Sequence, residues 1–266
     1  MTFRKLIWFL SRPPLYREML RRLSADIRRT QADREKVGIE REQAGSWCLA
    51  NTDTFEQWCA ATRLGGKPVS FSESHAAEWG AALAKANSCP VRMGGSGHLD
   101  LLYHACLQVK PEKVIETGVS LGWSTLAILT ALSEQGKGHL TSIDMPYPGR
   151  RGDRYVGWVV PDSLRARWTL LRGADRDVLP GLVAKLGGLD LVHYDSDKSP
   201  EGRTFAFELL WPALRPGGLL ISDDVQQNFG FQEFARRVSH RPWILRKPNG
   251  SFAGVLMKPP PAREWE

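Results

Sequence analysis

Acidic side chains stand at the end of two apolar segments of this chain. The segment 189–194 runs into Asp195, and the segment 217–222 runs into Asp223 and Asp224. If both segments are parallel strands of one sheet, their carboxyl ends meet at the edge where such sheets hold ligands. Three carboxylates so close together would repel one another unless a cation or protons intervened. Oxygen ligands of this kind suit Mg²⁺ or Ca²⁺, so the three residues are predicted to form a metal site.

A second pattern with chemical meaning is the glycine-rich segment E-T-G-V-S-L-G-W-S at positions 116–124. An apolar strand runs into Glu116, and Gly118 and Gly122 then allow sharp turns and the close approach of a ligand. The first N–H groups of the following helix point at the same place, which suits a nucleotide-like cofactor. The spacing differs from the G-x-G-x-x-G of dinucleotide-binding loops, and Glu116 suits a cationic or zwitterionic ligand. The alternative is an ordinary strand–turn–helix with incidental glycines.

Another acid, Asp144, ends the next predicted strand, 138–144. It lies about 20 residues past the glycine-rich segment, where α/β nucleotide folds place a carboxylate for the ribose hydroxyls. A carboxylate accepts two hydrogen bonds from a vicinal diol. We therefore expect Asp144 to bind a ribose, the alternative being a solvated Asp at a strand end.

The E-x-G-x-x-x-G-x-S pattern resembles the first motif of class I S-adenosylmethionine (SAM)-dependent methyltransferases. Over roughly residues 93–258, the chain also resembles the catechol O-methyltransferase-like branch and the bacterial enzymes related to macrocin O-methyltransferases. In that branch, an Asp after the fourth strand and an Asp-Asp or Asp-Asn pair after the fifth bind Mg²⁺, and a Lys three residues after the first Asp is the general base. The matching residues here are Asp195, Asp223, Asp224 and Lys198, together with Glu116, Gly118, Gly122 and Ser124 of the first motif. The aromatic gatekeepers of the animal enzyme have no equivalent, so a catechol acceptor is not implied.

The resemblance implies SAM as cofactor, with Mg²⁺ or another divalent cation, and methyl transfer to a hydroxyl of a small-molecule or glycan-like substrate, either free or lipid-linked. Asp175, after the predicted strand 168–173, would accept from the adenine amino group, unless the charged run 172–177 is a solvated loop. Met93 and Gly94 would pass over the methionine end of SAM, unless they form a plain linker. The predicted cofactor contacts are thus Glu116, Gly118, Ser120, Gly122, Trp123, Ser124, Asp144, Asp175, Met93 and Gly94.

The implied chemistry is an in-line displacement at the sulfonium methyl group, for which the enzyme holds donor and acceptor in near-attack geometry. A metal on the acceptor oxygen would lower its pKa. Lys198 and Asp195 are the predicted catalytic residues, with a desolvated Lys198 of lowered pKa taking the proton. Alternatively, Lys198 pairs with Asp197 on the surface, and one of the acids holds the SAM amino group. His193, inside an apolar strand, is expected to be a packed core residue.

The order of the predicted elements indicates an α/β fold. Apolar strands alternate with helical segments, which is typical of a doubly wound, mostly parallel sheet. A helix over 231–238 then precedes two apolar runs, 243–247 and 252–257, which flank Asn249-Gly250, a strong hairpin signal. An antiparallel C-terminal hairpin completes the seven-stranded Rossmann-like sheet of class I methyltransferases and distinguishes it from a plain NAD-binding domain.

Composition divides the chain into four parts. We expect a basic amphipathic helical extension over 1–41, a helical cap over 42–92, the SAM-binding domain over 93–258 and a loose tail over 259–266. In the cap, one helix is expected to carry the apolar residues of 47–59. The first part holds eleven basic and five acidic side chains, a net charge of +6 against +7 for the whole chain. The catalytic part is therefore almost neutral, which argues against a nucleic-acid substrate.

Residues 1–30 combine apolar and basic side chains. Leu15, Met19 and Leu23 recur at helical spacing with arginines between them. A basic amphipathic helix of this kind binds anionic membrane surfaces, which makes a peripheral membrane contact through residues 1–30 one interpretation. The other interpretations are docking on the chain's own domain and packing against a second copy in a homo-oligomer.

Two further features indicate a cytoplasmic protein. A peripheral contact with the inner face of the membrane is compatible with that location. No apolar run approaches the ~18–20 residues needed to cross a membrane, and the apolar start meets a Pro-Pro pair instead of a cleavage site. The cysteines show no C-x-x-C spacing and are expected to be free thiols in a reducing compartment; they are Cys48, Cys59, Cys89 and Cys106.

Two other functions stay open. The first is a non-catalytic protein of the same fold whose basic N-terminus binds a membrane or a partner. The presence of Lys198 and of the three acids at the strand ends argues against it, because a protein without catalytic activity does not require such a group of charged residues. The second is a nicotinamide-dependent oxidoreductase, which the glycine spacing and the C-terminal hairpin disfavour.

Overall fold

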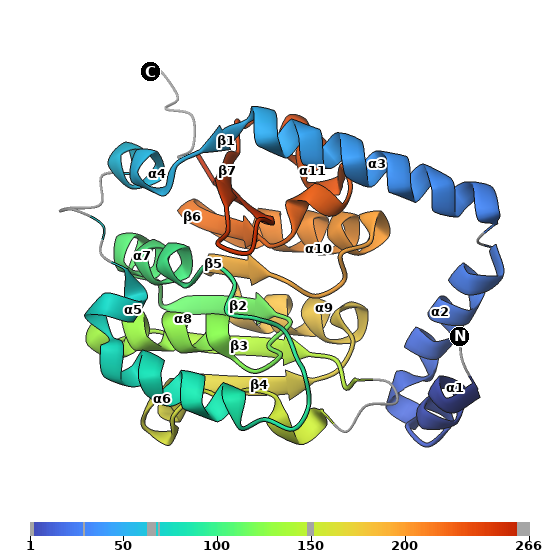
Figure 1. The fold of residues 1–266 in the computed structure, drawn as a ribbon, viewed down its shortest axis with the longest axis horizontal. Helices are drawn as coiled ribbons and strands as arrows, with labels where there is room; N and C mark the ends of the chain where they lie inside the picture. Colours follow the sequence, from blue (N-terminus) through green and yellow to red (C-terminus); the bar gives the residue numbers. More distant parts are fainter. Residues whose placement is uncertain (1–2, 29, 63–67, 69, 148–151, 260–266) are drawn as a thin grey trace.

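The computed structural model of the 266-residue chain describes residues 3–28, 30–62, 68, 70–147 and 152–259. Within these residues an eight-stranded sheet forms the centre of the molecule, in the order β1-β7-β8-β6-β5-β2-β3-β4, with helices on both of its faces (Figure 1). The predicted tail, 259–266, lies outside the described residues apart from its first position.

Parallel strands make up most of the sheet, and their bounds are β2 (Lys113–Thr117), β3 (His139–Asp144), β4 (Trp168–Arg172), β5 (Leu189–Tyr194) and β6 (Leu214–Ser222). The hairpin strands β7 (Trp243–Arg246) and β8 (Phe252–Met257) pair antiparallel with each other, and β8 pairs antiparallel with β6. The predicted doubly wound sheet with a C-terminal antiparallel hairpin is therefore confirmed. The register sets Glu116 of β2 beside Ser142 of β3 and His193 of β5.

The eighth strand comes from the N-terminal part of the chain. β1 (Thr52–Asp53) pairs in parallel with β7, so the sheet has one strand more than the seven predicted. The Asp53 carboxylate holds it there, since it accepts from the Arg241 guanidinium at 2.8 Å and from the Ile244 N–H at 3.4 Å. A strand of two residues shows no alternation of polar and apolar side chains, so it has no sequence signal.

Helices cover the sheet on both faces. One core cluster joins the sheet to α4 (Phe55–Ala61), α5 (Phe71–Ser74), α6 (Ala76–Asn87), α7 (Leu99–Val109) and α8 (Trp123–Glu134). Another joins it to α3 (Gln31–Ala50), α9 (Asp175–Leu186), α10 (Pro200–Ala213) and α11 (Gly230–Arg237). Short 3-10 helices are η2 (Asp153–Tyr155), η3 (Asp162–Arg167) and η4 (Val225–Gln227). Because both faces are covered, β2, β3 and β5 are buried almost along their whole length.

The N-terminal helices are α1 (Phe3–Leu10), η1 (Pro13–Leu15) and α2 (Tyr16–Arg28), and α3 follows them. Phe9, Leu15 and Met19 form a small core that also contacts Met145, in the loop after β3. α1 and α2 therefore dock beside the carboxyl ends of the strands (Figure 1), which supports the docking interpretation of this extension. In the part of the chain that the structure describes, no helix is long and apolar enough to cross a membrane.

The predicted division of the N-terminal part differs from the structure at two points. α3 runs without interruption through position 41, so the expected boundary between 41 and 42 lies inside a helix. The single helix expected over 47–59 is wrong, because α3 ends at Ala50 and α4 begins at Phe55. The reason is a capping box: the Thr54 hydroxyl accepts from the Gln57 N–H at 3.1 Å, and the Gln57 side chain accepts from the Thr54 N–H at 2.7 Å.

Candidate active site

Glu116 is the last residue but one of strand β2 and is fully buried. Its carboxylate accepts from the hydroxyls of Ser124 at 2.5 Å and of Thr125 and Ser142 at 2.7 Å, and His193 Nδ1 lies 3.4 Å away. Burial opposes the negative charge, but His193 and the hydroxyls outweigh it, and the pKa of Glu116 is lowered. Both oxygens thus have protein partners, and Glu116 orients Ser124 at the start of α8. Its direct contact with a cofactor stays a prediction.

His193 is buried within β5, as expected for a core residue. Burial alone would lower its pKa, but the adjacent Glu116 carboxylate raises it. The pair is an internal charge-assisted contact beneath the sheet edge. His193 also lines the smaller of two cavities described below.

The glycines of the 116–124 segment are required by neighbouring backbone. Gly118 has φ +82°, and a Cβ there would lie 2.5 Å from the carbonyl oxygen of Asp195. Gly122 has φ +94°, and a Cβ there would lie 2.8 Å from the Cα of Gly157. Both positions therefore exclude side chains whether or not a ligand approaches. Gly118 brings the glycine-rich loop directly against the end of β5.

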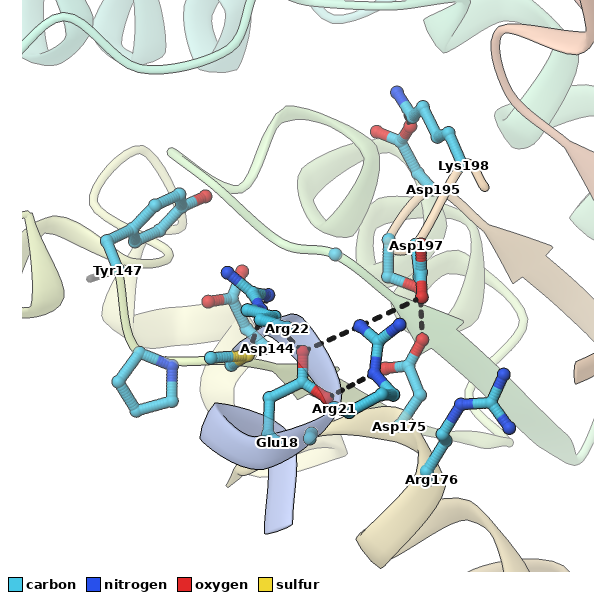
Figure 2. A pocket seen from close by; sticks show the side chains of 15 residues that line it. Glu18, Arg21, Arg22, Asp144, Tyr147, Asp175, Arg176, Asp195, Asp197 and Lys198 are labelled. Atoms are coloured by element: carbon cyan, nitrogen blue, oxygen red, sulfur yellow. Dashed lines mark hydrogen bonds and ion pairs between the residues drawn. The ribbon is translucent and has the colours of Figure 1, made fainter. Parts of the chain in front are cut away.

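Two cavities meet at this edge of the sheet. The first, of about 350 Å³, is lined by Gly118, Asp144 and Asp175 and, from α2, by Glu18, Arg21 and Arg22 (Figure 2). The second, of about 160 Å³, is lined by Gly94, Ser120, Trp123, Ser124, His193, Asp223, Asp224 and Lys247. Asp195 and Lys198 line both cavities. Met93 lies in a shallower hollow beside Tyr147. Most of the predicted cofactor residues thus surround one continuous region, whereas Glu116 and Gly122 support it from outside.

Asp144 is almost fully buried at the end of β3. One of its oxygens accepts from the backbone N–H groups of Val119 at 2.8 Å and Ser120 at 3.1 Å, and the other pairs with Arg172 at 2.6 Å. Burial raises its pKa despite these partners. Asp144 therefore braces the glycine-rich loop, and the predicted ribose contact would add to that role.

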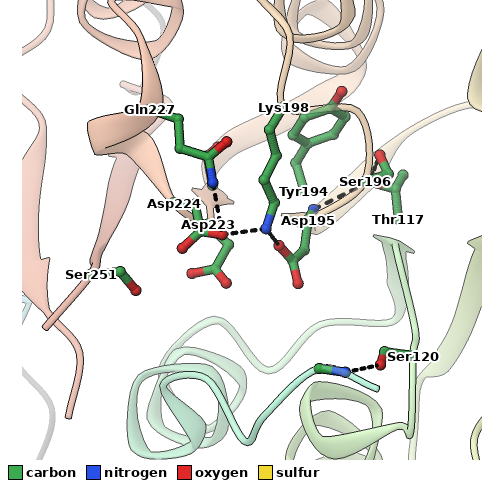
Figure 3. Close-up of polar contacts among 12 residues, drawn as sticks. Thr117, Ser120, Tyr194, Asp195, Ser196, Lys198, Asp223, Asp224, Gln227 and Ser251 are labelled. Carbon is green, nitrogen blue, oxygen red and sulfur yellow. Dashed lines mark hydrogen bonds and ion pairs between the residues drawn. The ribbon is translucent and has the colours of Figure 1, made fainter. Parts of the chain in front are cut away.

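Ser120 is a non-glycine residue at φ +53° within the same loop. Its Oγ accepts from the backbone N–H of Gly94 at 2.9 Å (Figure 3). This bond draws the segment before α7 over the second cavity. The placement agrees with the predicted position of Gly94 near the cofactor, although the contact itself stays a prediction.

Asp175 begins helix α9 and faces the first cavity (Figure 2). The hydroxyl of Ser196 donates to its carboxylate. Burial, which disfavours the charged form, raises the pKa of Asp175 to about 6. The alternative interpretation of this run as a solvated loop does not hold for Asp175.

The acids predicted at the strand ends come together with two lysines in what we term the carboxylate–lysine cluster: Asp195, Asp223, Asp224, Lys198 and Lys247. Oxygens of the three acids lie within 4.8 Å of one another. Lys198 Nζ lies 2.6 Å from Asp195 Oδ1 and also pairs with Asp224 (Figure 3). Lys247 Nζ lies 2.6 Å from Asp223 Oδ1 and 3.0 Å from Asp224 Oδ1. The predicted juxtaposition of the acids is therefore present, and each acid has an ammonium partner.

The expected lowering of the Lys198 pKa is wrong. Burial does oppose the charge of the ammonium group, but attraction to Asp195 and Asp224 outweighs burial and raises its pKa. The surface alternative also fails, because Asp197 pairs instead with Arg21 at 3.4 Å. Lys198 is held as a cation between two carboxylates, and in this state it donates rather than accepts protons.

Arg203, Lys247 and His98 belong to the site although the sequence did not indicate them. Arg203 is fully buried in α10 and donates to the carbonyl oxygens of Asp223 at 3.0 Å and Asp224 at 2.9 Å. This clamp holds the turn in which Asp224 has φ +51°. Neither Arg203 nor Lys247 stands in a recognisable motif, and only the fold brings them to the strand ends.

His98 caps helix α7 and lines the second cavity. Its Nδ1 accepts from the Leu101 N–H at 3.3 Å, so Nε2 carries the proton of the neutral ring. Burial lowers the pKa of His98 and thereby favours that neutral form. His98 therefore offers an N–H donor near the cluster.

The donor set alone fits a divalent ion, since three carboxylate oxygens converge. The folded cluster, with its two lysines, does not fit a divalent ion. A metal ion would share its ligands with two ammonium groups, each already 2.6 Å from one of the acids. We therefore derive no chemical step through a metal.

Residues 115–225 match a family model described as a methyltransferase domain. Residues 115–225 thus carry a methyltransferase domain. Solved structures similar to it include an O-methyltransferase from Bacillus cereus in complex with SAH (16% identity, TM-score 0.50, covering 79% of this chain and 100% of that one). Another is the O-methyltransferase TomG from Streptomyces achromogenes, involved in tomaymycin synthesis, in complex with SAM (18% identity, TM-score 0.50, covering 75% and 94%). At these identities the likeness concerns the fold. No curated protein matches the methyltransferase chain in sequence.

These findings confirm the resemblance to class I methyltransferases and the Rossmann-like fold of the methyltransferase domain. The acceptor, the metal and the individual residue roles inferred from the resemblance stay predictions.

Proposed function

We propose that this methyltransferase uses SAM to methylate a hydroxyl of a small-molecule or glycan-like acceptor. One observation carries the proposal: two cavities of unequal size meet at Asp195 and Lys198, next to the glycine-rich loop. The larger would take the adenosine, beside Asp144 and Asp175. The smaller would take the methionine end and the acceptor, beside Ser124.

Charge supports the binding of a sulfonium cofactor. The carboxylate–lysine cluster combines three acids and two lysines, which leaves one excess negative charge when all are ionised. SAM carries one net positive charge, on its sulfonium. A site of this sign in a partly dry cleft stabilises that cation more strongly than bulk water would.

The chain offers a donor and an acceptor for the reaction. Lys198, held as a cation, would donate a hydrogen bond to the acceptor oxygen and orient it. Asp195, whose pKa is raised to about 6 by burial and by Asp223, would accept its proton. As the oxygen forms its bond to the methyl carbon, the C–S electron pair stays on sulfur and the hydroxyl proton passes to Asp195. Near-attack positioning supplies most of the rate.

A large groove adjoins the cavity proposed for the adenosine. It encloses about 950 Å³ between α2, α3 and the start of α10, and Arg21, Arg22, Arg176 and Asp197 line both this groove and the first cavity. Lys5 and Lys36 also line it, together with the acids Asp33, Glu40 and Glu201. The groove is therefore of mixed charge, and it shares no lining residue with the smaller cavity, where the acceptor would bind.

The test is calorimetric titration with S-adenosylhomocysteine. We expect micromolar binding by the native protein and a 5- to 10-fold loss in Ser124→Ala, the worth of one hydrogen bond. Ser133→Ala, an exposed serine on the same helix α8, is the matched control and should bind normally. Absence of binding by the native protein would remove the proposal, and tight binding of NADH instead would favour the oxidoreductase.

We further propose a peripheral contact of α1 and α2 with anionic membranes at the cytoplasmic face. Their inner side is packed, but Phe3, Ile7, Leu10, Leu20 and Ile27 are more than half exposed. Apolar side chains beside basic ones suit an anionic bilayer surface. Flotation with phosphatidylglycerol vesicles should recover the native protein and lose Ile7→Ser/Leu20→Ser. Equal recovery with neutral vesicles, or none at all, would contradict the contact. Light scattering of the purified protein without vesicles reports whether it is a homo-oligomer.

A further inference from the structure

We propose that Lys247 is a built-in cation that takes the place of a divalent metal, so that this methyltransferase works without Mg²⁺. The inference rests on the proposed function, since it concerns how the same site holds SAM and the acceptor. It departs from the metal site that the sequence motifs imply.

The position of Lys247 carries the inference. Its ammonium lies 2.6 Å from Asp223 Oδ1 and 3.0 Å from Asp224 Oδ1, two of the three acids predicted to bind the metal. Lys198 takes the remaining acid, Asp195, at 2.6 Å and shares Asp224 with Lys247. All three candidate ligands are therefore occupied by ammonium groups.

The Lys247 side chain is built in rather than free to leave. It is 4% exposed, a degree of burial that is rare for a lysine without a charged partner. Its backbone is fixed in the hairpin turn, where its N–H donates to the Ser251 carbonyl at 2.7 Å and its own carbonyl accepts from Gly250 at 2.9 Å. Folding of the hairpin thus already orders the Lys247 side chain. If it were displaced, the carboxylates of Asp223 and Asp224 would repel each other without a cation between them.

The charge of the site leads to the same conclusion. With both lysines present, the three acids retain one excess negative charge, which the sulfonium of SAM balances. Addition of a divalent ion would reverse the sign of the site before SAM arrives. An ion within reach of Asp224 would also lie close to both ammonium groups, and this repulsion is strong in a partly buried cluster. Without Lys247, the excess would be two negative charges, which a divalent ion would balance.

The direct test is Mn²⁺ binding followed by electron paramagnetic resonance, in the presence of S-adenosylhomocysteine. The native protein should bind no Mn²⁺ below about 1 mM at this site. Lys247→Met keeps the length of the side chain and removes its charge, and it should bind Mn²⁺ at least 10-fold more tightly. Lys137→Met removes a lysine that is paired with Glu112 on the surface and should behave like the native protein.

Thermal unfolding supplies a second readout. Lys247→Met should lower the Tm by about 5–10 °C, because two carboxylates lose a partner, and 5 mM Mg²⁺ should restore much of that loss. The Tm of the native protein should not respond to Mg²⁺. Should Lys247→Met fail to fold, the Mn²⁺ titration of the native protein decides alone.

Micromolar Mn²⁺ binding by the native protein, or turnover lost with EDTA and regained with Mg²⁺, would overturn the inference. Binding of S-adenosylhomocysteine is measured in the same samples. If it occurs together with tight Mn²⁺ binding, only the role of Lys247 fails; if the native protein does not bind it at all, the proposed function fails.

Discussion

Arg21 of helix α2 lies 3.4 Å from the carboxylate of Asp197, in the loop that follows strand β5. Both residues line the first cavity, and Glu18 holds Arg21 in place with hydrogen bonds of 2.7 Å (Figure 2). Helix α2 of the N-terminal extension therefore forms part of the lining of the proposed cofactor site. This contact could not be predicted from residues 1–30 alone.

Loss of the ion pair between Arg21 and Asp197 should weaken cofactor binding. We expect Arg21→Gln to reduce the affinity for S-adenosylhomocysteine by 2- to 5-fold, because a partly exposed ion pair is worth about 0.5–1 kcal/mol. Arg17→Gln, an exposed arginine one turn earlier in α2, is the control and should leave the affinity unchanged. Calorimetry on both variants checks this, and equal affinities would show that α2 does not shape the site.

Glu116 should prove to be a stability determinant. Glu116→Ala leaves the hydroxyls of Ser124, Thr125 and Ser142 without their buried acceptor and His193 without its counterion. We expect the free energy of unfolding to fall by about 3–5 kcal/mol.

Urea unfolding measures this loss. Glu112→Ala removes an acid that is paired with Lys137 on the surface, and it should cost about 1 kcal/mol or less. A Glu116→Ala protein that is as stable as the control would contradict the buried network.

The stability of the protein should respond to the pH through Asp175. Its folded pKa of about 6 lies above the ordinary value of 3.8, so the folded state holds the proton more tightly than the unfolded state. The contribution of Asp175 to stability is therefore present below about pH 4 and is lost as the pH rises through 6. Asp175→Asn should make the protein more stable than the native form at pH 7, by about 1–2 kcal/mol.

Urea unfolding at pH 4.5, 5.5 and 7 follows this difference, which should shrink as the pH falls. Asp177→Asn, at an exposed position of the same helix, is the matched control. A difference that is constant with pH would mean that Asp175 ionises normally.

Gly118 should tolerate substitution less than another glycine of similar conformation. Gly118→Ala adds a methyl group 2.5 Å from the Asp195 carbonyl oxygen at φ +82°, whereas Gly136→Ala at φ +67° meets nothing within 4 Å. Gly136→Ala should cost about 1 kcal/mol, from backbone strain alone. Gly118→Ala should cost at least about 2 kcal/mol more and weaken binding of S-adenosylhomocysteine, because the loop must move from β5. Equal costs in thermal unfolding would show that the contact with Asp195 is not tight.

Local patterns in the sequence determined much of the fold. The strands before Glu116, Asp144 and Asp195 are short apolar runs, and the Asn249-Gly250 turn separates two more, so each element is specified by neighbours along the chain. Parallel strands then necessarily bring the acids at their carboxyl ends to one edge. The approach of Asp195, Asp223 and Asp224 to one another could therefore be predicted without a structure.

Only the tertiary structure decided what neutralises those acids. Lys247 reaches their carboxylates from the hairpin, whereas Arg203 of α10 holds the backbone carbonyls of Asp223 and Asp224, and no spacing rule connects either residue to the acids. The direction of the Lys198 pKa likewise depends on distances across the sheet edge, because burial and ion pairing act in opposite senses and the nearer carboxylates prevail. A sequence shows which charged side chains a protein has. Which of them pair with one another depends on their distances in space, and the packing of segments that are remote in the sequence sets those distances.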